Sequence, residues 1–203
     1  ALAWIDRNKA KPFFLYYAEH SVHEPFDPKP ELLAKYRKKT PAGLDQGITP
    51  EYAATVEAVD ASIGRILAKL ESLGLTKDTL VIFTSDNGGL PYVVNPLRGS
   101  KGLLYEGGIC VPGAVSWPGT IPAGKSFDEP VASIDFLPTI LEAAGIPLPK
   151  EQPTDGVSLL KQLKVGAPLN RPAIFWHFPC YIGKGEPMSL LRAGDYKLIH
   201  KFA

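Results

Sequence analysis

The longest hydrophobic pattern in the chain predicts an amphipathic helix over residues 49–73. Its apolar residues recur every three or four positions, so they lie on one face of a helix. Thr49, Pro50 and Glu51 supply a capping hydroxyl, a proline at the first helical position and an acid in the first turn. Gly74 follows the last apolar position and favours an end of the helix there.

Two shorter helices are predicted in a similar way. Residues 133–144 form an apolar periodic segment in which Ser133 or Asp135 can serve as the cap. One or two helical turns are predicted within 30–38, inside a proline- and lysine-rich excursion over residues 24–48. The rest of that excursion is expected to be a surface loop.

Two continuous apolar runs, residues 12–18 and 79–85, predict strands that are buried on both faces. Both runs are rich in aromatic or β-branched side chains, and their length suits a strand of a parallel sheet. A strand, a helix and a second strand in this order are typical of a βαβ unit. The expected fold class is therefore α/β.

Alternating segments near the C-terminus predict a small antiparallel sheet that begins at about residue 171. Residues 161–171 resemble a linker before this sheet, and residues 114–117 predict a separate short strand. A hairpin turn is expected at Gly194, between the last two strands. The strands of the small sheet are predicted at residues 173–178, 188–192 and 196–202.

Length and composition indicate an ordinary globular protein. The 203 residues are enough for one domain with a real core, and 45% of them are hydrophobic and 21% charged. The formal net charge of +1 argues against nucleic acid or an acidic membrane surface as a partner. No apolar run approaches the roughly 20 residues that cross a bilayer.

The first residues predict that the sequence begins in the middle of a fold. It starts at Ala1 without the basic start and apolar run of a signal peptide, and Leu2 and Ile5 already fit one turn of an amphipathic helix. We therefore expect a processed product or a part of a longer gene. Cys110 and Cys180 show no metal-ligand or redox spacing, so both are expected to be buried, unreactive residues.

Polar clusters follow both predicted buried strands. The first strand runs into His20 and His23, and the second runs into Asp86 and Asn87. In open α/β sheets, ligands bind outside the carboxyl ends of the strands, so both clusters are expected at one edge of the sheet. Asp86 and Asn87 offer the oxygen ligands that Ca²⁺ or Mg²⁺ prefer, although a plain turn at a strand end has the same sequence.

His23 and Lys101 are further candidates for a site. An imidazole at His23 could bind an anionic oxygen or protonate a leaving group, although a single histidine, like His20, is commonly structural or merely exposed. Lys101 lies between Gly99 and Gly102, so the backbone can approach an anion whose charge the ammonium balances. The loop lacks the Walker spacing, which argues against a nucleotide-binding P-loop.

An ordered series of motifs resembles the type I sulfatases of the alkaline phosphatase superfamily over almost the whole chain. The Asp-Asn-Gly form at residues 86–88 matters most, because related phosphatases and phosphodiesterases tend to have Asp-His-Gly and to bind zinc. The motifs are FFLYYA with His-Glu-Pro at 23–25, TLVIFTSDNG at 79–88, GSKGLLYEGG at 99–108, WPG at 117–119, IDFLPTI at 134–140, DGVSLL at 155–160 and RAGDYKLI at 192–199.

This resemblance implies an alkaline-phosphatase-like mixed sheet flanked by helices, with a small C-terminal antiparallel sheet. Residues 1–165 would be the C-terminal part of the sulfatase catalytic domain, and residues 171–203 a small antiparallel β subdomain. The implied cofactor is Ca²⁺ or Mg²⁺, and the implied substrate is a sulfate ester, in particular a sulfated glycan. Such enzymes are mostly periplasmic, secreted or lysosomal.

Site residues are carried over from the family by position. The resemblance implies that Asp86 and Asn87 are metal ligands, and that His23 and Lys101 are the catalytic pair that contacts the sulfate and assists the departing oxygen. His177 resembles a substrate-binding histidine of one sulfatase subgroup. Two alternatives stay open for it: a role in the substrate pocket, or no role in the site.

The chain departs from the family pattern in ways that bear on activity. Cys110 stands where the family has Arg in Glu-Gly-Gly-x-Arg, which is expected to loosen the loop that holds Lys101. Cys180 replaces the second histidine of the subgroup motif that contains His177. The Cys- or Ser-x-Pro-x-Arg segment, whose first residue becomes formylglycine, is expected in a missing N-terminal part, together with an Asp pair that supplies further metal ligands.

The resemblance therefore implies half of a catalytic site. A hydrated aldehyde would attack sulfur, while this chain supplies the charge and proton on the leaving-group side. We expect the isolated chain to be inactive and to bind metal weakly, because Ca²⁺ usually takes 6–8 oxygen ligands.

Three other functions stay open. The first is a phosphoryl hydrolase or transferase of the same superfamily; Asn87 argues against it, and a requirement for zinc would argue for it. A non-catalytic fragment derived from a sulfatase is the second alternative. A glycan-binding module is the third, and it rests on aromatic residues such as Trp176 and Tyr181, which are more often found in a core.

Overall fold

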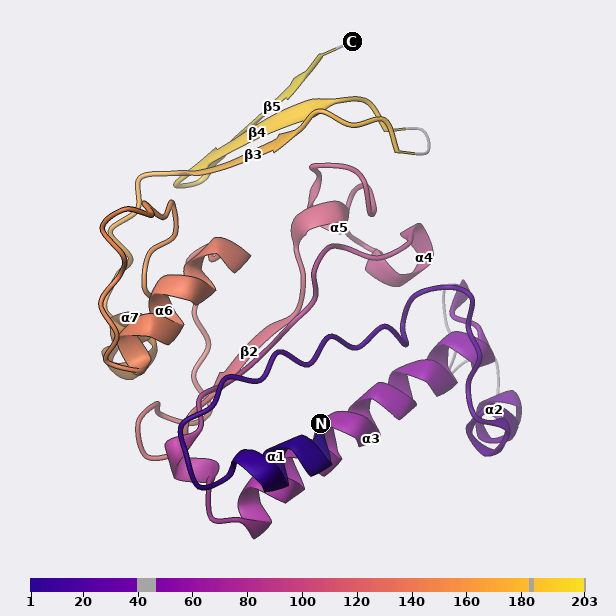
Figure 1. The fold of residues 1–203 in the computed structure, drawn as a ribbon. Helices are drawn as coiled ribbons and strands as arrows, with labels where there is room; N and C mark the ends of the chain where they lie inside the picture. The colour runs from indigo at the N-terminus through magenta and orange to yellow at the C-terminus, as the bar shows by residue number, and fades with distance from the viewer. Residues whose placement is uncertain (40–46, 183–184, 203) are drawn as a thin grey trace. The chain divides into compact units, whose positions relative to one another are not determined.

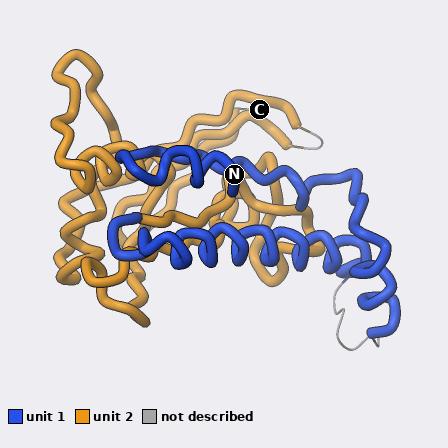
Figure 2. The backbone as a smooth tube through the Cα atoms, turned by 60° about the horizontal axis from the view of Figure 1, so that its bottom comes forward, with its two compact units in different colours: residues 1–79 blue, residues 80–203 orange. Residues whose placement is uncertain are grey.

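The computed structural model describes residues 1–39, 47–182 and 185–202 (Figure 1). It divides into two compact units, residues 1–79 and residues 80–203 (Figure 2), and each is described by itself. Among the described residues, no helix combines the length and the hydropathy that crossing a membrane requires.

The first unit is built on the long helix that the hydrophobic pattern predicts. The Thr49 hydroxyl accepts a hydrogen bond from the Tyr52 amide at 3.1 Å, and Gly74 ends the helical segment with a φ of 69°. Ile5 and Ala54 are fully buried in this unit. Its helices are α1 (Leu2–Asn8), α2 (Pro30–Arg37), α3 (Pro50–Ser72) and the short η3 (Thr76–Asp78).

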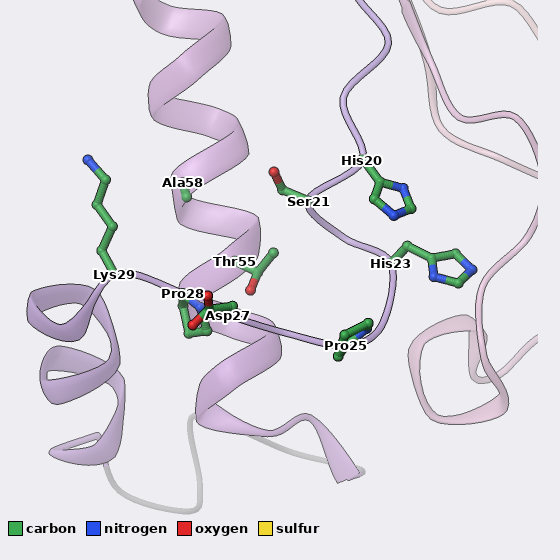
Figure 3. Close-up of a pocket in the computed structure, with 9 residues that line it drawn as sticks. All are labelled: His20, Ser21, His23, Pro25, Asp27, Pro28, Lys29, Thr55 and Ala58. Atoms are coloured by element: carbon green, nitrogen blue, oxygen red, sulfur yellow. The ribbon is translucent and has the colours of Figure 1, made fainter.

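The segment between α1 and α2 lies along α3 without forming a strand. Ion pairs join α1 and α2 to α3. Asp6 of α1 pairs with Lys69 at 3.1 Å, and Lys35 of α2 pairs with Glu57 at 2.6 Å. Figure 3 shows the last part of the segment, residues 20–29, beside α3.

The prediction of a buried strand at residues 12–18 is wrong. The segment forms no strand, and Phe14 and Tyr16 are 67% and 79% exposed. A strand exists only where a neighbouring strand accepts and donates its backbone hydrogen bonds, and the described part of the first unit contains no strand. The apolar composition of the segment is therefore not sufficient to make it a strand.

The second unit begins with an antiparallel pair of strands. β1 (Val81–Thr84) pairs with β2 (Gly113–Ser116), with Val81 opposite Ser116. Both strands were predicted, but β1 is not buried on both faces, since Phe83 is 43% exposed. Between and after them lie α4 (Pro91–Val94), α5 (Glu106–Ile109), η4 (Ser133–Asp135), α6 (Phe136–Ala143) and α7 (Leu160–Val165).

The helix α7 corrects the prediction of a linker at residues 161–171. Its first residue, Leu160, is 5% exposed, and the preceding Leu159 is 3% exposed, so burial of apolar side chains favours order here. Gly166 ends the helix in the left-handed conformation with a φ of 69°. That glycine is the signal in the sequence that could have predicted the helix.

The small C-terminal antiparallel sheet is confirmed. Its order is β3-β4-β5, and Gly194 turns the hairpin between β4 and β5 with a φ of 53°. On its inner face Met188 and Leu190 form a hydrophobic cluster with Leu104. The strands are β3 (Ile174–Phe178), β4 (Met188–Ala193) and β5 (Tyr196–Lys201).

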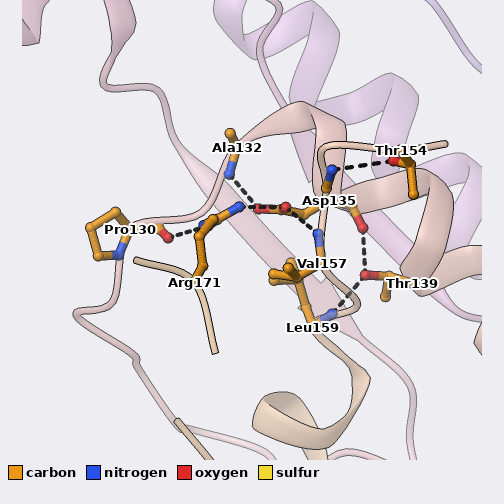
Figure 4. A network of polar contacts seen from close by, with 9 residues as sticks. Pro130, Ala132, Asp135, Thr139, Thr154, Val157, Leu159 and Arg171 are labelled. Carbon is orange, nitrogen blue, oxygen red and sulfur yellow. Dashed lines mark hydrogen bonds and ion pairs between the residues drawn. The ribbon is translucent and has the colours of Figure 1, made fainter. Parts of the chain in front are cut away.

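A buried polar network fixes the start of this sheet to η4 (Figure 4). Asp135 is fully buried, and its carboxylate accepts from the amides of Ala132 at 2.8 Å and Val157 at 2.9 Å. The Arg171 guanidinium donates to the same carboxylate and to the Pro130 carbonyl, both at 2.6 Å. The network thus joins three segments that are distant in the sequence.

Candidate functional site

Asp86 and Asn87 lie in the turn that directly follows β1. Asp86 is exposed, Asn87 is half-buried and Gly88 is buried. The Ser85 hydroxyl donates to the Asn87 carbonyl at 3.0 Å and holds the turn closed. The two side chains that resemble metal ligands therefore come from adjacent positions of one anchored turn.

This turn is packed against the glycine-rich segment through a glycine cluster, which we define as Gly88, Gly107 and Gly108. The Gly88 amide donates to the Gly108 carbonyl at 2.9 Å. A Cβ atom on Gly88 would lie 1.9 Å from the Gly107 carbonyl oxygen, and one on Gly108 would lie 1.9 Å from the Leu103 carbonyl oxygen. Only residues without a side chain allow these backbones to approach so closely.

Lys101 belongs to the same backbone arrangement. Its amide donates to the Gly89 carbonyl at 2.9 Å, which ties the loop of Lys101 to the turn of Asp86 and Asn87. The Gly107 amide donates to the Arg98 carbonyl at 2.8 Å. This hydrogen bond joins the two ends of residues 98–107, which we call the Lys101 loop. The structure thus brings together three of the five predicted site residues.

The glycine cluster gives a first prediction. Gly88→Ala is expected to destabilise the protein by about 1–3 kcal/mol, because the added methyl group collides with backbone rather than with a movable side chain. Thermal unfolding of the protein that contains this chain measures the effect. Gly113→Ala is the matched control, because a Cβ there meets nothing within 4 Å. Equal melting temperatures for the two variants would refute the close packing.

His23 lies in the first unit, in a turn that also carries His20. The His23 amide donates to the His20 carbonyl at 3.0 Å, and the two rings stack with centroids 5.3 Å apart (Figure 3). Nδ1 of His23 lies 2.7 Å from the Glu24 carbonyl oxygen, which can only accept, so Nδ1 carries the proton in the neutral ring. A cavity of about 240 Å³ adjoins both histidines and reaches Thr55 of α3.

Glu19 organises this turn. Its carboxylate accepts hydrogen bonds from the Ser21 amide at 3.0 Å, from the Ser21 hydroxyl and from the Tyr17 hydroxyl at 2.7 Å. The Ser21 hydroxyl, followed by the Tyr17 hydroxyl, lowers the pKa of Glu19. Tyr17 in turn accepts from the Ser62 hydroxyl of α3 at 2.8 Å, so the turn is anchored to the helix.

The lowered pKa of Glu19 predicts acid sensitivity of the turn. A depressed pKa in the folded state stabilises the fold above the ordinary carboxyl range, and this stabilisation is lost as the pH falls through the lowered value. The melting temperatures of wild type and Glu19→Gln should therefore differ near about pH 7 and converge near about pH 3. A difference in melting temperature between wild type and Glu19→Gln that stays constant from about pH 7 to about pH 3 would contradict the assignment.

His177 lies apart from the glycine cluster. It alternates along β3 with Trp176 and Phe178, which pack against the hydrophobic cluster of the inner face, so His177 is on the opposite face of the sheet. Its Nδ1 is 2.7 Å from the Ser189 hydroxyl, and its ring contacts Phe202 edge-on at 5.8 Å.

The expectation that the cysteines are buried is wrong, since Cys110 and Cys180 are both exposed.

The donor atoms fit a hard cation in kind but not in number. Within the described ranges, no three His, Cys, Asp or Glu side chains gather in a way that could hold a metal ion. Asp86 and Asn87 supply a carboxylate and an amide oxygen, which suit Ca²⁺ or Mg²⁺, whereas Ca²⁺ takes 6–8 oxygens. Any complete site needs further ligands.

Two contacts of the Lys101 loop have no signal in the sequence. Lys197 of β5 forms an ion pair with Glu106, the first residue of α5. A Cβ on Gly102 would lie 3.3 Å from a methyl carbon of Ile182, which places Ile182 next to the loop. Both contacts join residues that are about 80 or more positions apart, and no local pattern predicts such pairs.

Family models match both parts of the chain. A model described as "Sulfatase" matches residues 1–146, and one described as "N-sulphoglucosamine sulphohydrolase, C-terminal" matches residues 100–203. A sulfatase of Formosa agariphila is 40% identical over 97% of the chain and 39% of its own length. The human steryl-sulfatase is 36% identical over 81% of the chain and 28% of its own length.

Solved structures extend the similarity. Ps i-CgsB in complex with k-i-k-neocarrahexaose is 31% identical with a TM-score of 0.83, over 98% of this chain and 44% of that one. PsFucS1 sulfatase from Pseudoalteromonas sp. is 29% identical with a TM-score of 0.78, over 97% and 38%. These matches confirm the predicted α/β class with an alkaline-phosphatase-like fold. The chain spans less than half the length of these relatives.

Proposed function

Since the chain belongs to the sulfatase family, we propose that it is the C-terminal part of the catalytic region of a longer sulfuric ester hydrolase. The observation that carries the proposal is the glycine cluster, which joins the Asp86-Asn87 turn to the Lys101 loop through backbone contacts. In this proposal residues 1–165 complete the catalytic domain, and residues 171–203 form a small β subdomain.

Asp86 and Asn87 are the proposed metal ligands in this chain. Their oxygens suit Ca²⁺ or Mg²⁺, and the remaining ligands would come from an Asp pair N-terminal to these residues. A bound divalent cation would supply positive charge against the sulfate oxygens, and a formylglycine in the same N-terminal part would supply the attacking oxygen. The hydrogen bond from the Ser85 hydroxyl to the Asn87 carbonyl holds the backbone of the turn from which the two side chains extend.

Lys101 and His23 are the proposed catalytic residues. The Lys101 ammonium would donate to the sulfate oxygens and offset their charge as the ester bond breaks. His23 would give a proton to the departing alcohol oxygen, with its ring oriented by the hydrogen bond from Nδ1 to the Glu24 carbonyl. Both residues act on the leaving-group side, which is why we expect the isolated chain to be inactive.

A sulfated glycan is the proposed substrate, in the periplasm, outside the cell or in the lysosome. A solved relative, BT4656, is described in complex with "its substrate D-Glucosamine-2-N, 6-O-disulfate", and it is 30% identical with a TM-score of 0.63 over 85% of this chain. His177 stays a proposed substrate contact. From the exposed face of the small sheet, it would meet a part of the glycan away from the reacting ester.

The test begins with the gene upstream of the codon for Ala1. An open reading frame with an Asp pair and a Cys- or Ser-x-Pro-x-Arg segment provides the full-length protein for assay. Sulfate release from 4-nitrophenyl sulfate and from sulfated oligosaccharides should be abolished by chelation and restored by Ca²⁺ or Mg²⁺. Zinc-dependent release of phosphate instead would favour a phosphoryl hydrolase, and a start codon at the boundary would favour a non-catalytic fragment.

A further inference from the structure

The inner face of the small sheet is in contact with the loop that carries Lys101. Leu104, three residues after Lys101, is 5% exposed and packs in the hydrophobic cluster with Met188 and Leu190 of β4. Lys197 of β5 forms an ion pair with Glu106. The sheet therefore contacts this loop through an apolar contact and a charged one.

The ion pair lies next to the hydrogen bond that closes the Lys101 loop. Glu106 is the first residue of α5, and its carbonyl accepts from the Cys110 amide at 2.7 Å. The next residue, Gly107, donates to the Arg98 carbonyl and closes the loop that contains Lys101. A shift of Glu106 would therefore move the closing hydrogen bond of the loop itself.

The charged contact is partly buried rather than fully solvated. The Lys197 and Glu106 side chains are 23% and 40% exposed. An ion pair whose partners keep this much contact with water contributes little to the stability of a protein, so a large effect on the free energy of unfolding is not expected from it. Its effect comes from its position next to the loop of Lys101, because small misplacements of a reacting group lower rates strongly.

We infer that Lys197 is a positioning residue for Lys101: by its ion pair with Glu106 it holds the closing hydrogen bond of the loop in place and thereby fixes the backbone from which the Lys101 side chain extends. The inference rests on the proposed function only for its effect on catalysis. The effect on the loop itself is independent of any activity.

The test compares Lys197→Met, Lys197→Arg and Lys201→Met in the full-length protein. Lys201 is the matched control, because it lies on the same strand and pairs with Glu186 at 3.1 Å with both partners about half exposed. For Lys197→Met, we expect kcat with 4-nitrophenyl sulfate to fall about 10-fold, KM to change less than about 2-fold and the melting temperature to fall by about 3 °C or less. Lys197→Arg should restore most of kcat, and Lys201→Met should match wild type.

Hydrogen exchange at the Lys101 amide separates the inference from the proposed function. Exchange should be about 10-fold faster in Lys197→Met than in wild type or Lys201→Met, whether or not the protein hydrolyses a sulfate ester. Unchanged exchange overturns the inference, as does a loss of kcat that Lys197→Arg fails to restore. A wild type with the predicted exchange pattern but no sulfatase activity overturns the proposed function alone.

Discussion

Replacing Lys101 by methionine in the full-length protein is expected to lower kcat/KM for a sulfate ester by about 10²–10³-fold. Methionine keeps most of the length of the side chain and removes its charge, so the sulfate oxygens lose a fixed donor at the point where their charge changes. The loop should keep its shape, because backbone hydrogen bonds of Lys101 and Gly107 hold it. Steady-state kinetics with 4-nitrophenyl sulfate measures the loss.

Lys125→Met is the control for this result. Lys125 is an exposed lysine of the same unit, next to Gly124 in a turn. It should leave kcat/KM within about 2-fold of wild type, as surface substitutions generally do. If Lys101→Met were as active as Lys125→Met, Lys101 would have no part in the chemistry, and the loop would be a structural element only.

Replacing Asp135 by alanine is expected to destabilise the protein by about 3–5 kcal/mol, because it leaves the Arg171 cation buried without its partner. Arg171 is 7% exposed, so water cannot replace the lost carboxylate. The amides of Ala132 and Val157 lose their acceptors at the same time. In a domain of about 150–250 residues, such a loss corresponds to a fall in melting temperature of about 6–20 °C.

Glu186→Ala is the matched substitution for this measurement. It breaks the ion pair with Lys201, in which both side chains are about half exposed, and should cost about 0–1 kcal/mol. Thermal unfolding followed by circular dichroism compares the two variants in the full-length protein. A loss for Asp135→Ala no greater than that for Glu186→Ala would mean that Asp135 and Arg171 are not buried together.

Local patterns predicted the elements that are stabilised locally. The helix α3 has an uninterrupted apolar period and a hydroxyl cap at Thr49, and both are visible in the sequence. The hairpin of β4 and β5 has a turn glycine, Gly194, between two alternating strands. In such elements the pattern and the cap are sufficient, because few distant contacts are needed to choose the structure.

Elements that depend on distant partners were predicted poorly. The apolar run at residues 12–18 matches a strand in composition, but a strand needs a neighbour that composition does not provide. The helix α7 is stabilised by burial of Leu160, which becomes clear only when the packing is known. The ion pair between Glu106 and Lys197 also could not be predicted from the sequence, because only the packing brings these distant residues together.

The candidate site was predicted through the strand ends and the family resemblance rather than through packing. The sequence placed Asp86 and Asn87 directly after a strand, where the structure has them, and it singled out Lys101 for its glycine neighbours. It could not predict that the backbones of Gly88 and Gly108 pack closely and hydrogen-bond, and so join the Asp86-Asn87 turn to the loop of Lys101. The glycines of this loop predict a close approach of the backbone to an anion, whereas in the structure Gly88, Gly107 and Gly108 allow two backbone segments to approach each other.

The buried pair of Asp135 and Arg171 also decides how this chain can be recombined with its relatives. A chimera that takes its C-terminal sheet from another family member, with the crossover between Val165 and Arg171, receives the donor's residue opposite Asp135. A crossover just after Arg171 keeps both partners from one parent, together with the Pro130 carbonyl that the guanidinium also binds. Libraries that exchange the small sheet should therefore yield folded proteins mainly from junctions on the C-terminal side of Arg171.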